Sequence, residues 1–242
     1  MTRYAIYFSP PARTPLASLG AAWLGRDCDT DQDLTPPTLE GISAEEQARI
    51  TQQPRRYGFH ATMKPPFHLA PGATLDDVRQ SLRALATRAR NTALPPLKVR
   101  SLSRFLALVP SRPTPEVEDL AAACVRDLDR LRAQPAPGEL ERRRRAGLSE
   151  RQETLLTRWG YPYVMEAFRF HMTLTGPIEP DLSARLLPQL NAYFGEVLAR
   201  EQRIDALSLF EQQEPDLPFR RIDRIPLSDF GIDGRAGACD AA

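Results

Sequence analysis

Two short segments of this chain, far apart in the sequence, repeat the same pattern around a histidine. Residues 57–67 read YGFHATMKPPF and residues 168–178 read FRFHMTLTGPI. Aligned on His60 and His171, each segment has a phenylalanine before the histidine, a threonine two places after it and a proline six places after it. Because the chain contains only three histidines, two of them occupy equivalent positions. This repeat predicts two strands that contribute to one site.

Strand periodicity divides each segment into two faces, because successive side chains on a strand point to opposite sides. One face is polar and the other apolar, as expected for a strand packed on helices. The polar faces carry Gly58, His60, Thr62 and Lys64 in the first segment and Arg169, His171, Thr173 and Thr175 in the second. An imidazole, a hydroxyl and a cation on one face are suited to holding an anion.

Composition narrows the class of protein. A chain of 242 residues with 42% hydrophobic and 26% charged residues is typical of a soluble globular protein with a sizeable core. A net charge of +1 argues against binding extended nucleic acid by bulk electrostatics. Three widely spaced cysteines and no signal-like or membrane-spanning segment predict a cytoplasmic protein that does not contact a membrane. The oligomeric state is left open.

The remaining segments alternate between strand and helix patterns. Residues 4–8, 97–109, 204–210 and 219–227 have strand chemistry, and residues 15–24, 42–52, 74–90, 116–131, 149–159 and 182–198 have helical spacing or caps. The run Arg142–Arg145 is interpreted as a solvated helix face or loop rather than a nucleic-acid patch.

The order of these elements predicts an α+β fold built from a duplicated unit. We expect one domain over residues 1–230, made of two pseudo-symmetric lobes at about 1–96 and 97–230. Each lobe is expected to hold a small antiparallel sheet with helices on its outer face, and the lobes enclose a central groove. Residues 231–242, rich in Gly, Ala and Asp, are expected to form a flexible tail.

The paired motifs His60-Ala61-Thr62-Met63 and His171-Met172-Thr173-Leu174 resemble the HxT motifs of the two-histidine (2H) phosphoesterase superfamily. The longer string YGFHATMKPPF is similar to the bacterial branch associated with phosphonate utilisation. The resemblance covers most of the chain. It implies two lobes around a groove and metal-independent hydrolysis of phosphodiesters, with His60 and His171 as the catalytic pair and Thr62 and Thr173 on the phosphate. No cofactor is expected.

Physical chemistry is consistent with these roles. Imidazole has an unperturbed pKa of about 6.5, so two histidines can hold opposite protonation states near neutrality. Lys64 and Arg169 are added as phosphate-binding candidates from strand parity alone. Tyr4 and Tyr57 are candidates for lining the groove, and Tyr7, Phe67, Phe210 and Phe219 are assigned to the core.

Other interpretations of these residues are weaker. His68 follows a double proline and is interpreted as structural. Zinc held by the three histidines is disfavoured, because no carboxylate or thiol lies at ligand spacing near them.

The sequence therefore predicts hydrolysis of a small, cyclic phosphodiester, either a phosphorylated ribose cyclic phosphate or a phosphonate ester. Two alternatives stay open: an RNA 2′,3′-cyclic phosphodiesterase or ligase, and a non-catalytic protein that binds nucleotides or RNA. The sequence does not distinguish which histidine is the base.

Overall fold

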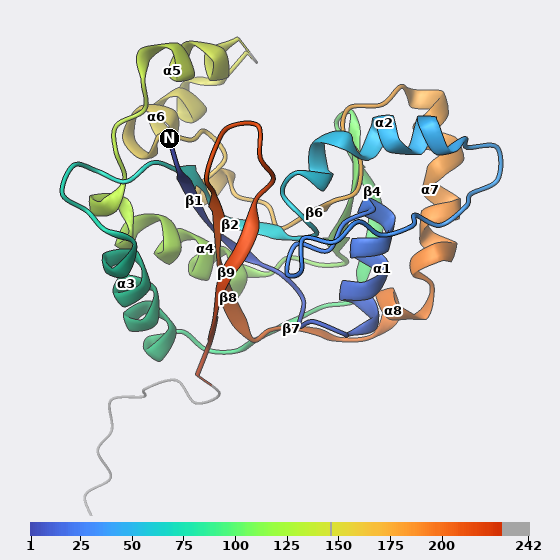
Figure 1. The fold of residues 1–242 in the computed structure, drawn as a ribbon, viewed down its shortest axis with the longest axis horizontal. Coiled ribbons are helices and arrows are strands. Elements are labelled where there is room, and N and C mark those ends of the chain that lie inside the picture. Colours follow the sequence, from blue (N-terminus) through green and yellow to red (C-terminus); the bar gives the residue numbers. More distant parts are fainter. Residues whose placement is uncertain (146, 229–242) are drawn as a thin grey trace, which may run out of the picture.

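Seven strands form one antiparallel sheet in the order β4-β5-β6-β2-β1-β8-β9, in a computed structural model that describes residues 1–145 and 147–228 (Figure 1). The expected tail at 231–242 lies outside the described residues. The strands are β1 (Arg3–Phe8), β2 (Ala61–Phe67), β4 (Leu97–Leu102), β5 (Phe105–Pro110), β6 (Met172–Thr173), β8 (Ala206–Gln212) and β9 (Arg220–Pro226). A second sheet pairs β3 (Thr92–Leu94) with β7 (Gln202–Ile204).

Eight α-helices accompany the sheets in the described part of the chain. They are α1 (Pro15–Leu24), α2 (Ala44–Arg55), α3 (Leu75–Arg88), α4 (Pro115–Asp127), α5 (Pro137–Arg144), α6 (Glu150–Trp159), α7 (Pro180–Phe194) and α8 (Glu196–Ala199). The predicted starts of α2, α3 and α6 are confirmed: Ser43, Thr74 and Ser149 each accept a hydrogen bond from a backbone N–H in the first turn.

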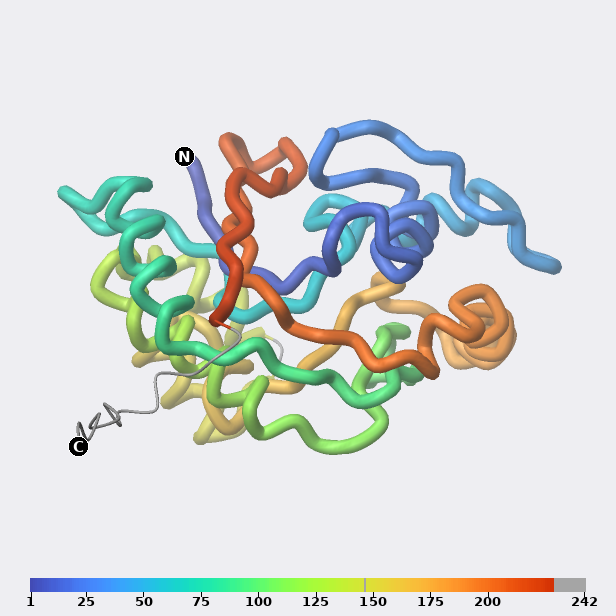
Figure 2. The backbone as a smooth tube through the Cα atoms, turned by 90° about the horizontal axis from the view of Figure 1, so that it is seen from below, coloured from blue at the N-terminus to red at the C-terminus, as the bar shows by residue number. Residues whose placement is uncertain are grey.

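The α+β class is confirmed, but the strands do not form two small sheets within residues 1–96 and 97–230. Strands β8 and β9 come from the end of the chain, yet β8 pairs with β1, so one sheet contains both halves. The helices also group across the expected boundary: α1 and α2 lie beside α7 and α8, and α3 lies beside α4 (Figure 1, Figure 2). The sequence pattern marked the strands but carried no information on their partners.

Two predicted strands differ in extent. Residues 97–109 form a hairpin rather than one strand, because the chain turns at Ser103, which has a positive φ of 56°. The second histidine segment forms only the two-residue strand β6. The chain before it is irregular and continues from the short 3₁₀ turn at Met165–Ala167.

One large core lies between the sheet and the helices. Met63 of β2 packs there with Leu82 of α3, Leu120 of α4 and Leu190 of α7, and each is almost fully buried. Burying such a side chain contributes roughly 1.5–3 kcal/mol. Trp23 of α1 donates its indole N–H to the carbonyl of Leu174 at 2.8 Å, which fixes α1 to the segment after β6. The core therefore packs against the apolar face of β2 and β6, the strands of the two histidine motifs.

The run Arg142–Arg145 ends the surface helix α5, as predicted. Arg143 is paired with Glu139 at 2.7 Å and Arg144 with Glu153 at 2.6 Å. Among the described residues, no helix combines the length and the apolar character needed to cross a membrane.

Candidate active site

The two histidine motifs meet in the middle of the sheet. Strands β2 and β6 are antiparallel neighbours, with Ala61 opposite Met172. This register places His60 opposite Thr173 and Thr62 opposite His171. We call these four side chains the His/Thr quartet. All four are half-buried on the face opposite to that of Ala61 and Met172, which lie in the core.

The register also sets the separation of the two imidazoles. His60 and His171 are diagonal neighbours across the strand pair, and such positions lie about 7–8 Å apart. A single phosphate fits between two hydrogen-bonding groups at this spacing. The His171 side chain is close enough that its positive charge disfavours protonation of His60. The sequence predicted that the two histidine strands lie in facing lobes across a groove. The register instead makes them neighbouring strands of one sheet, with all four side chains on one face.

Both imidazoles are oriented by the backbone two residues earlier. Nδ1 of His60 lies 2.8 Å from the carbonyl oxygen of Gly58, and Nδ1 of His171 lies 2.7 Å from that of Arg169. A carbonyl oxygen only accepts, so Nδ1 carries the proton in each ring and Nε2 is left for proton transfer. Nε2 of His60 lies 3.2 Å from the Thr62 hydroxyl, which donates to it when the ring is neutral.

The two histidines differ in their surroundings. The ring of Tyr7 stacks on His60 at 3.8 Å between centroids and 26° between planes, with Tyr57 at 6.1 Å and Phe210 at 6.4 Å. Burial lowers the pKa of His60 to about 4, although its hydrogen bond to Gly58 acts in the opposite direction. Burial also lowers the pKa of His171, whose aromatic neighbour is Phe105 at 5.7 Å. The neutral form is therefore favoured more strongly for His60 than for His171.

Lys64 does not share the face of His60, so the expectation from strand parity is wrong. Tyr7 of β1 pairs with Thr62, but the adjacent Ile6 pairs with Lys64. At this point β2 therefore has one residue more than β1. This β-bulge turns Lys64 toward the helices. Its side chain is buried at 2% exposure, and Nζ donates to the carbonyl of Val125 at 3.2 Å in the last turn of α4. Lys64 therefore caps a helix C-terminus.

Burial of Lys64 predicts an unusual dependence of stability on alkaline pH. Desolvation lowers its pKa from 10.5 to about 8 in the folded protein. Above pH 8 the folded state loses this proton while the unfolded state keeps it until about pH 10.5, so the ammonium's destabilising effect is relieved as pH rises. Relative to Lys64→Met, the wild-type free energy of unfolding is expected to rise by about 3 kcal/mol between pH 7.5 and 10.5.

Urea unfolding across this pH range measures the change. Lys98→Met is the matched control, because the half-buried Lys98 makes a long 3.4 Å contact with the carbonyl of Ser111 and is not enclosed as Lys64 is. A constant difference between wild type and Lys64→Met would contradict the prediction.

The other candidate residues fall in different places. Tyr57 is half-buried beside His60, as expected. Tyr4 is not at the site, because it packs in the large core on the opposite face of β1. Arg169 is exposed, and its carbonyl positions His171. His68 donates from Nδ1 to the carbonyl of Thr2 at 2.8 Å, a structural contact at the end of β2.

Three residues on the same sheet face as the quartet have no site role in the sequence-based prediction. Tyr7 was assigned to the core, yet its ring covers His60. Ser9 and Arg221 received no role, although Ser9 follows Phe8, the partner of Ala61. Alternation within residues 4–8 gives two faces but does not identify which one meets the histidines.

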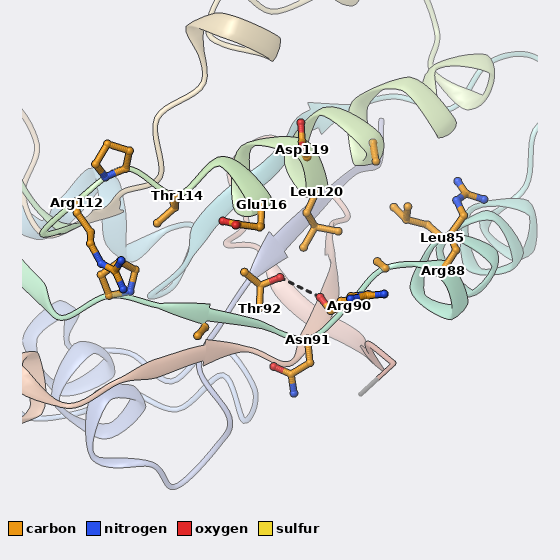
Figure 3. Close-up of a pocket in the computed structure, with 15 residues that line it drawn as sticks. Leu85, Arg88, Arg90, Asn91, Thr92, Arg112, Thr114, Glu116, Asp119 and Leu120 are labelled. Atoms are coloured by element: carbon orange, nitrogen blue, oxygen red, sulfur yellow. Dashed lines mark hydrogen bonds between the residues drawn. The ribbon is translucent and has the colours of Figure 1, made fainter. Parts of the chain in front are cut away.

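Two further features are not part of the His/Thr quartet. A cavity of about 680 Å³ opens between α3, α4 and β3, lined by residues such as Arg88, Thr92 and Glu116 (Figure 3). Asp27, Cys28 and Asp29 form a group whose atoms could approach a metal ion. Burial raises the pKa of the Cys28 thiol to about 12, and Asp29 is paired with Arg221, so neither group is ready to act as a ligand.

Comparisons with known proteins give one family and a few relatives. A family model described as "Protein of unknown function (DUF1045)" matches residues 62–220. A protein of Janthinobacterium sp. (strain Marseille), named ribose 1,5-bisphosphate phosphokinase PhnN, is 40% identical over 235 residues, which are 96% of this chain and 52% of that protein. A protein of the same name from Laribacter hongkongensis (strain HLHK9) is 39% identical over 218 residues, 90% of this chain and 50% of that protein. The chain therefore spans about half the length of these curated relatives.

Solved structures resemble the chain more distantly. The crystal structure of a phosphoesterase has a TM-score of 0.45 and 13% identity, covering 94% of this chain and 99% of the other. The crystal structure of E. coli LigT complexed with NADP⁺ has a TM-score of 0.41 and 12% identity, covering 94% and 98%.

Proposed function

The chain belongs to the DUF1045 family of proteins of unknown function, and we propose that it hydrolyses a small, cyclic phosphodiester with His60 and His171 as its acid/base pair. The observation that carries this proposal is the His/Thr quartet. Two imidazoles with unprotonated Nε2 atoms lie diagonally across one strand pair, and each has a threonine hydroxyl opposite it. The HxT motifs that resemble the 2H phosphoesterases are the residues that form this quartet.

Each member of the quartet has a role in the proposed reaction. Nε2 of one neutral imidazole accepts a proton from water, and the water oxygen attacks phosphorus. The bond from phosphorus to the leaving oxygen breaks, and Nε2 of the other, protonated imidazole supplies a proton to that oxygen. Thr62 and Thr173 donate hydrogen bonds to the non-bridging oxygens. Each proton transfer contributes typically about 10²–10⁴-fold to the rate.

The surroundings of the two rings support an assignment of the base and the acid. A base must be neutral in the free protein, and the half-buried, Tyr7-stacked His60 has the lower pKa. We therefore assign His60 as general base and His171 as general acid. The negative charge of a bound phosphate raises the pKa of a neighbouring imidazole, so binding substrate favours the protonated form of His171.

The names of the relatives are consistent with a phosphorylated ribose as the substrate class. Their kinase activity is assigned to proteins about twice as long as this chain. The present sequence contains no GxxxxGK[S/T] phosphate loop, the motif that many kinases use to hold a nucleoside triphosphate. A phosphorylated ribose cyclic phosphate, or a phosphonate ester of similar size, is therefore our preferred substrate.

A substrate screen tests the proposal. Protein stripped of metal with a chelator would be incubated with ribose 1,2-cyclic phosphate, its 5-phosphorylated form, a phosphonate ester and a short RNA ending in a 2′,3′-cyclic phosphate. Turnover of the sugar phosphates in the presence of chelator is the expected result. Turnover of the RNA alone would favour the RNA cyclic phosphodiesterase alternative, and binding without any turnover would favour the non-catalytic one.

The pH dependence of kcat/KM is expected to be bell-shaped and displaced to acid pH. Activity rises with pH as His60 loses its proton, with a midpoint of about 4. It falls again as His171 loses its proton, at a pKa below the ordinary value of about 6.5. Since kcat/KM reports the free protein and kcat the complex, the alkaline limb of kcat should lie at higher pH than that of kcat/KM. An acid limb of kcat/KM near pH 6.5 would contradict the assignment of His60 as base.

A further inference from the structure

A half-buried arginine lies on the same sheet face as the quartet, two strands beyond Tyr7. Arg221 of β9 pairs with Phe210 of β8, which packs with Tyr7 on that face. Its guanidinium donates to the Ser9 hydroxyl at 3.1 Å and contacts Asp29. The Ser9 and Ser208 hydroxyls are themselves 2.9 Å apart, and both serines are buried. The arginine and the two serines form a continuous polar strip.

This strip begins next to His60. Phe8 pairs with Ala61, and Ser9 and His60 each extend that ladder by one residue on the polar face. Ser208 pairs with Tyr7 in the next strand. Because neighbouring strands lie about 4.8 Å apart, the strip lies roughly 10 Å from the centre of the quartet. This is about the length of a phosphorylated pentose.

The strip opens into a cavity of about 560 Å³, which Ser9, Arg221, Arg13 and Phe59 help to line. Arg13 is exposed and has a positive φ of 64°, a strained conformation for a residue other than glycine. Arg26 also lines the cavity and is bound to Asp31.

The carboxylates of Asp27 and Asp29 also line this cavity. Asp27 accepts hydrogen bonds from the backbone N–H groups of Asp29 and Thr30, and Asp29 is paired with Arg221. A guanidinium has five N–H donors, so Arg221 keeps donors beyond those given to Ser9 and Asp29.

We propose that Arg221 and Ser9 hold a second anionic group of the substrate, a phosphate monoester about one sugar length from the diester that the quartet cleaves. This inference rests on the proposed function, since it identifies the two ends of one substrate. Arg221 sets specificity and takes no part in bond breaking. A purely structural role for Arg221, tying β9 to the loop at Asp29, is the competing interpretation.

The two interpretations predict opposite effects of Asp29→Asn on the binding of the phosphorylated substrate. If the ion pair only ties β9 to the loop, Arg221→Gln and Asp29→Asn both weaken it and have the same effect. If Arg221 binds an anion, Asp29 competes with that anion and repels it. Asp29→Asn, which keeps a hydrogen-bond acceptor, is then expected to strengthen binding of the phosphorylated substrate, and Arg221→Gln to weaken it.

The experiment uses ribose 1,2-cyclic phosphate and its 5-phosphorylated form, which differ by one dianionic group. Their Kd values are measured by calorimetry on the His171→Ala protein, and their kcat/KM values on the protein with both histidines. The 5-phosphorylated form is expected to bind about tenfold or more tightly, a charge-assisted effect. Arg221→Gln should reduce this ratio to about one, and Asp29→Asn should keep or raise it. Arg220→Gln is the matched control, because Arg220 is the exposed neighbour on β9 and should keep the wild-type ratio.

Failure of this inference can be distinguished from failure of the proposed function. Turnover of both compounds with a Kd ratio of one, or equal losses of the ratio in Arg221→Gln and Asp29→Asn, would overturn the second anion site alone. A tenfold Kd ratio without turnover would overturn the hydrolase while supporting the anion site. Absence of both binding and turnover would overturn both. Thermal unfolding of each variant verifies that it folds.

Discussion

Replacing His171 by alanine is expected to lower kcat by about 10²–10⁴-fold while largely keeping substrate binding, because it removes the proton donor and leaves both threonines in place. His171 is half-buried directly before the two-residue strand β6, and within the described part of the chain its ring makes one hydrogen bond, to the carbonyl of Arg169. The fold should therefore be retained. His60→Ala is expected to cause a loss of similar size through the missing base.

The two substitutions should not add. Base and acid act in the same step, so the double variant His60→Ala/His171→Ala is expected to be only slightly slower than either single variant. Single-turnover kinetics with a sugar cyclic phosphate, beside calorimetric Kd values, measure this. His68→Ala is the control, since the third histidine contacts Thr2 at the far end of β2 and should keep its kcat. Unchanged turnover in His171→Ala would remove the basis of the mechanism.

Replacing Gly58 by alanine is expected to lower kcat about 10²-fold or more, although position 58 provides no side chain to the site. Gly58 has a φ of +76°, and a Cβ there would lie 2.6 Å from Cβ and 3.0 Å from Sγ of Cys28. Cys28 is buried, so the backbone must shift instead. The shift moves the carbonyl that holds Nδ1 of His60, and a misplacement of about 1 Å can reduce a rate 10²-fold.

A second glycine separates backbone strain from this displacement. Gly72 has a similar φ of +81°, but a Cβ there meets nothing within 4 Å. Gly72→Ala should therefore lose about 1–2 kcal/mol of stability with no loss of kcat. Gly58→Ala should lose both, and Cys28→Gly in the same chain should restore part of the kcat by removing the obstructing atoms. Equal kcat values in Gly58→Ala and Gly72→Ala would show that position 58 does not set the His60 geometry.

Local features of the fold were predictable because their causes lie within a few residues. Thr74 and Asp77 form a capping box from adjacent sequence, and α3 begins where that pair predicts. The placement of each histidine on the same strand face as its threonine followed from a repeat of two residues, which survives even where the second strand is short. Neither feature depends on neighbouring strands, whereas the pairing of β2 with β6 that brings the two motifs together does.

Features that depend on pairing between distant segments were not predictable. Lys64 is two residues beyond Thr62, but the bulge that turns it inward is set by its pairing with Ile6. Tyr7 rather than Tyr4 meets His60, because the face of β1 that points to the site is determined by β2 and β8. Arg221 reaches Ser9 only because β8 and β9 join the sheet beside β1. Each of these contacts depends on which strands are neighbours in the sheet and on the register of their pairing.

The pairing of β1 with β8 also determines when this protein can fold during synthesis. Residues 3–8 leave the ribosome before all the intervening elements, and their partner strand at 206–212 follows only after these. Until then one edge of β1 exposes its amide and carbonyl groups, which invites aggregation with other chains. Such long-range pairing slows folding, so a translation product that stops before residue 206 would be a target for chaperones or proteases.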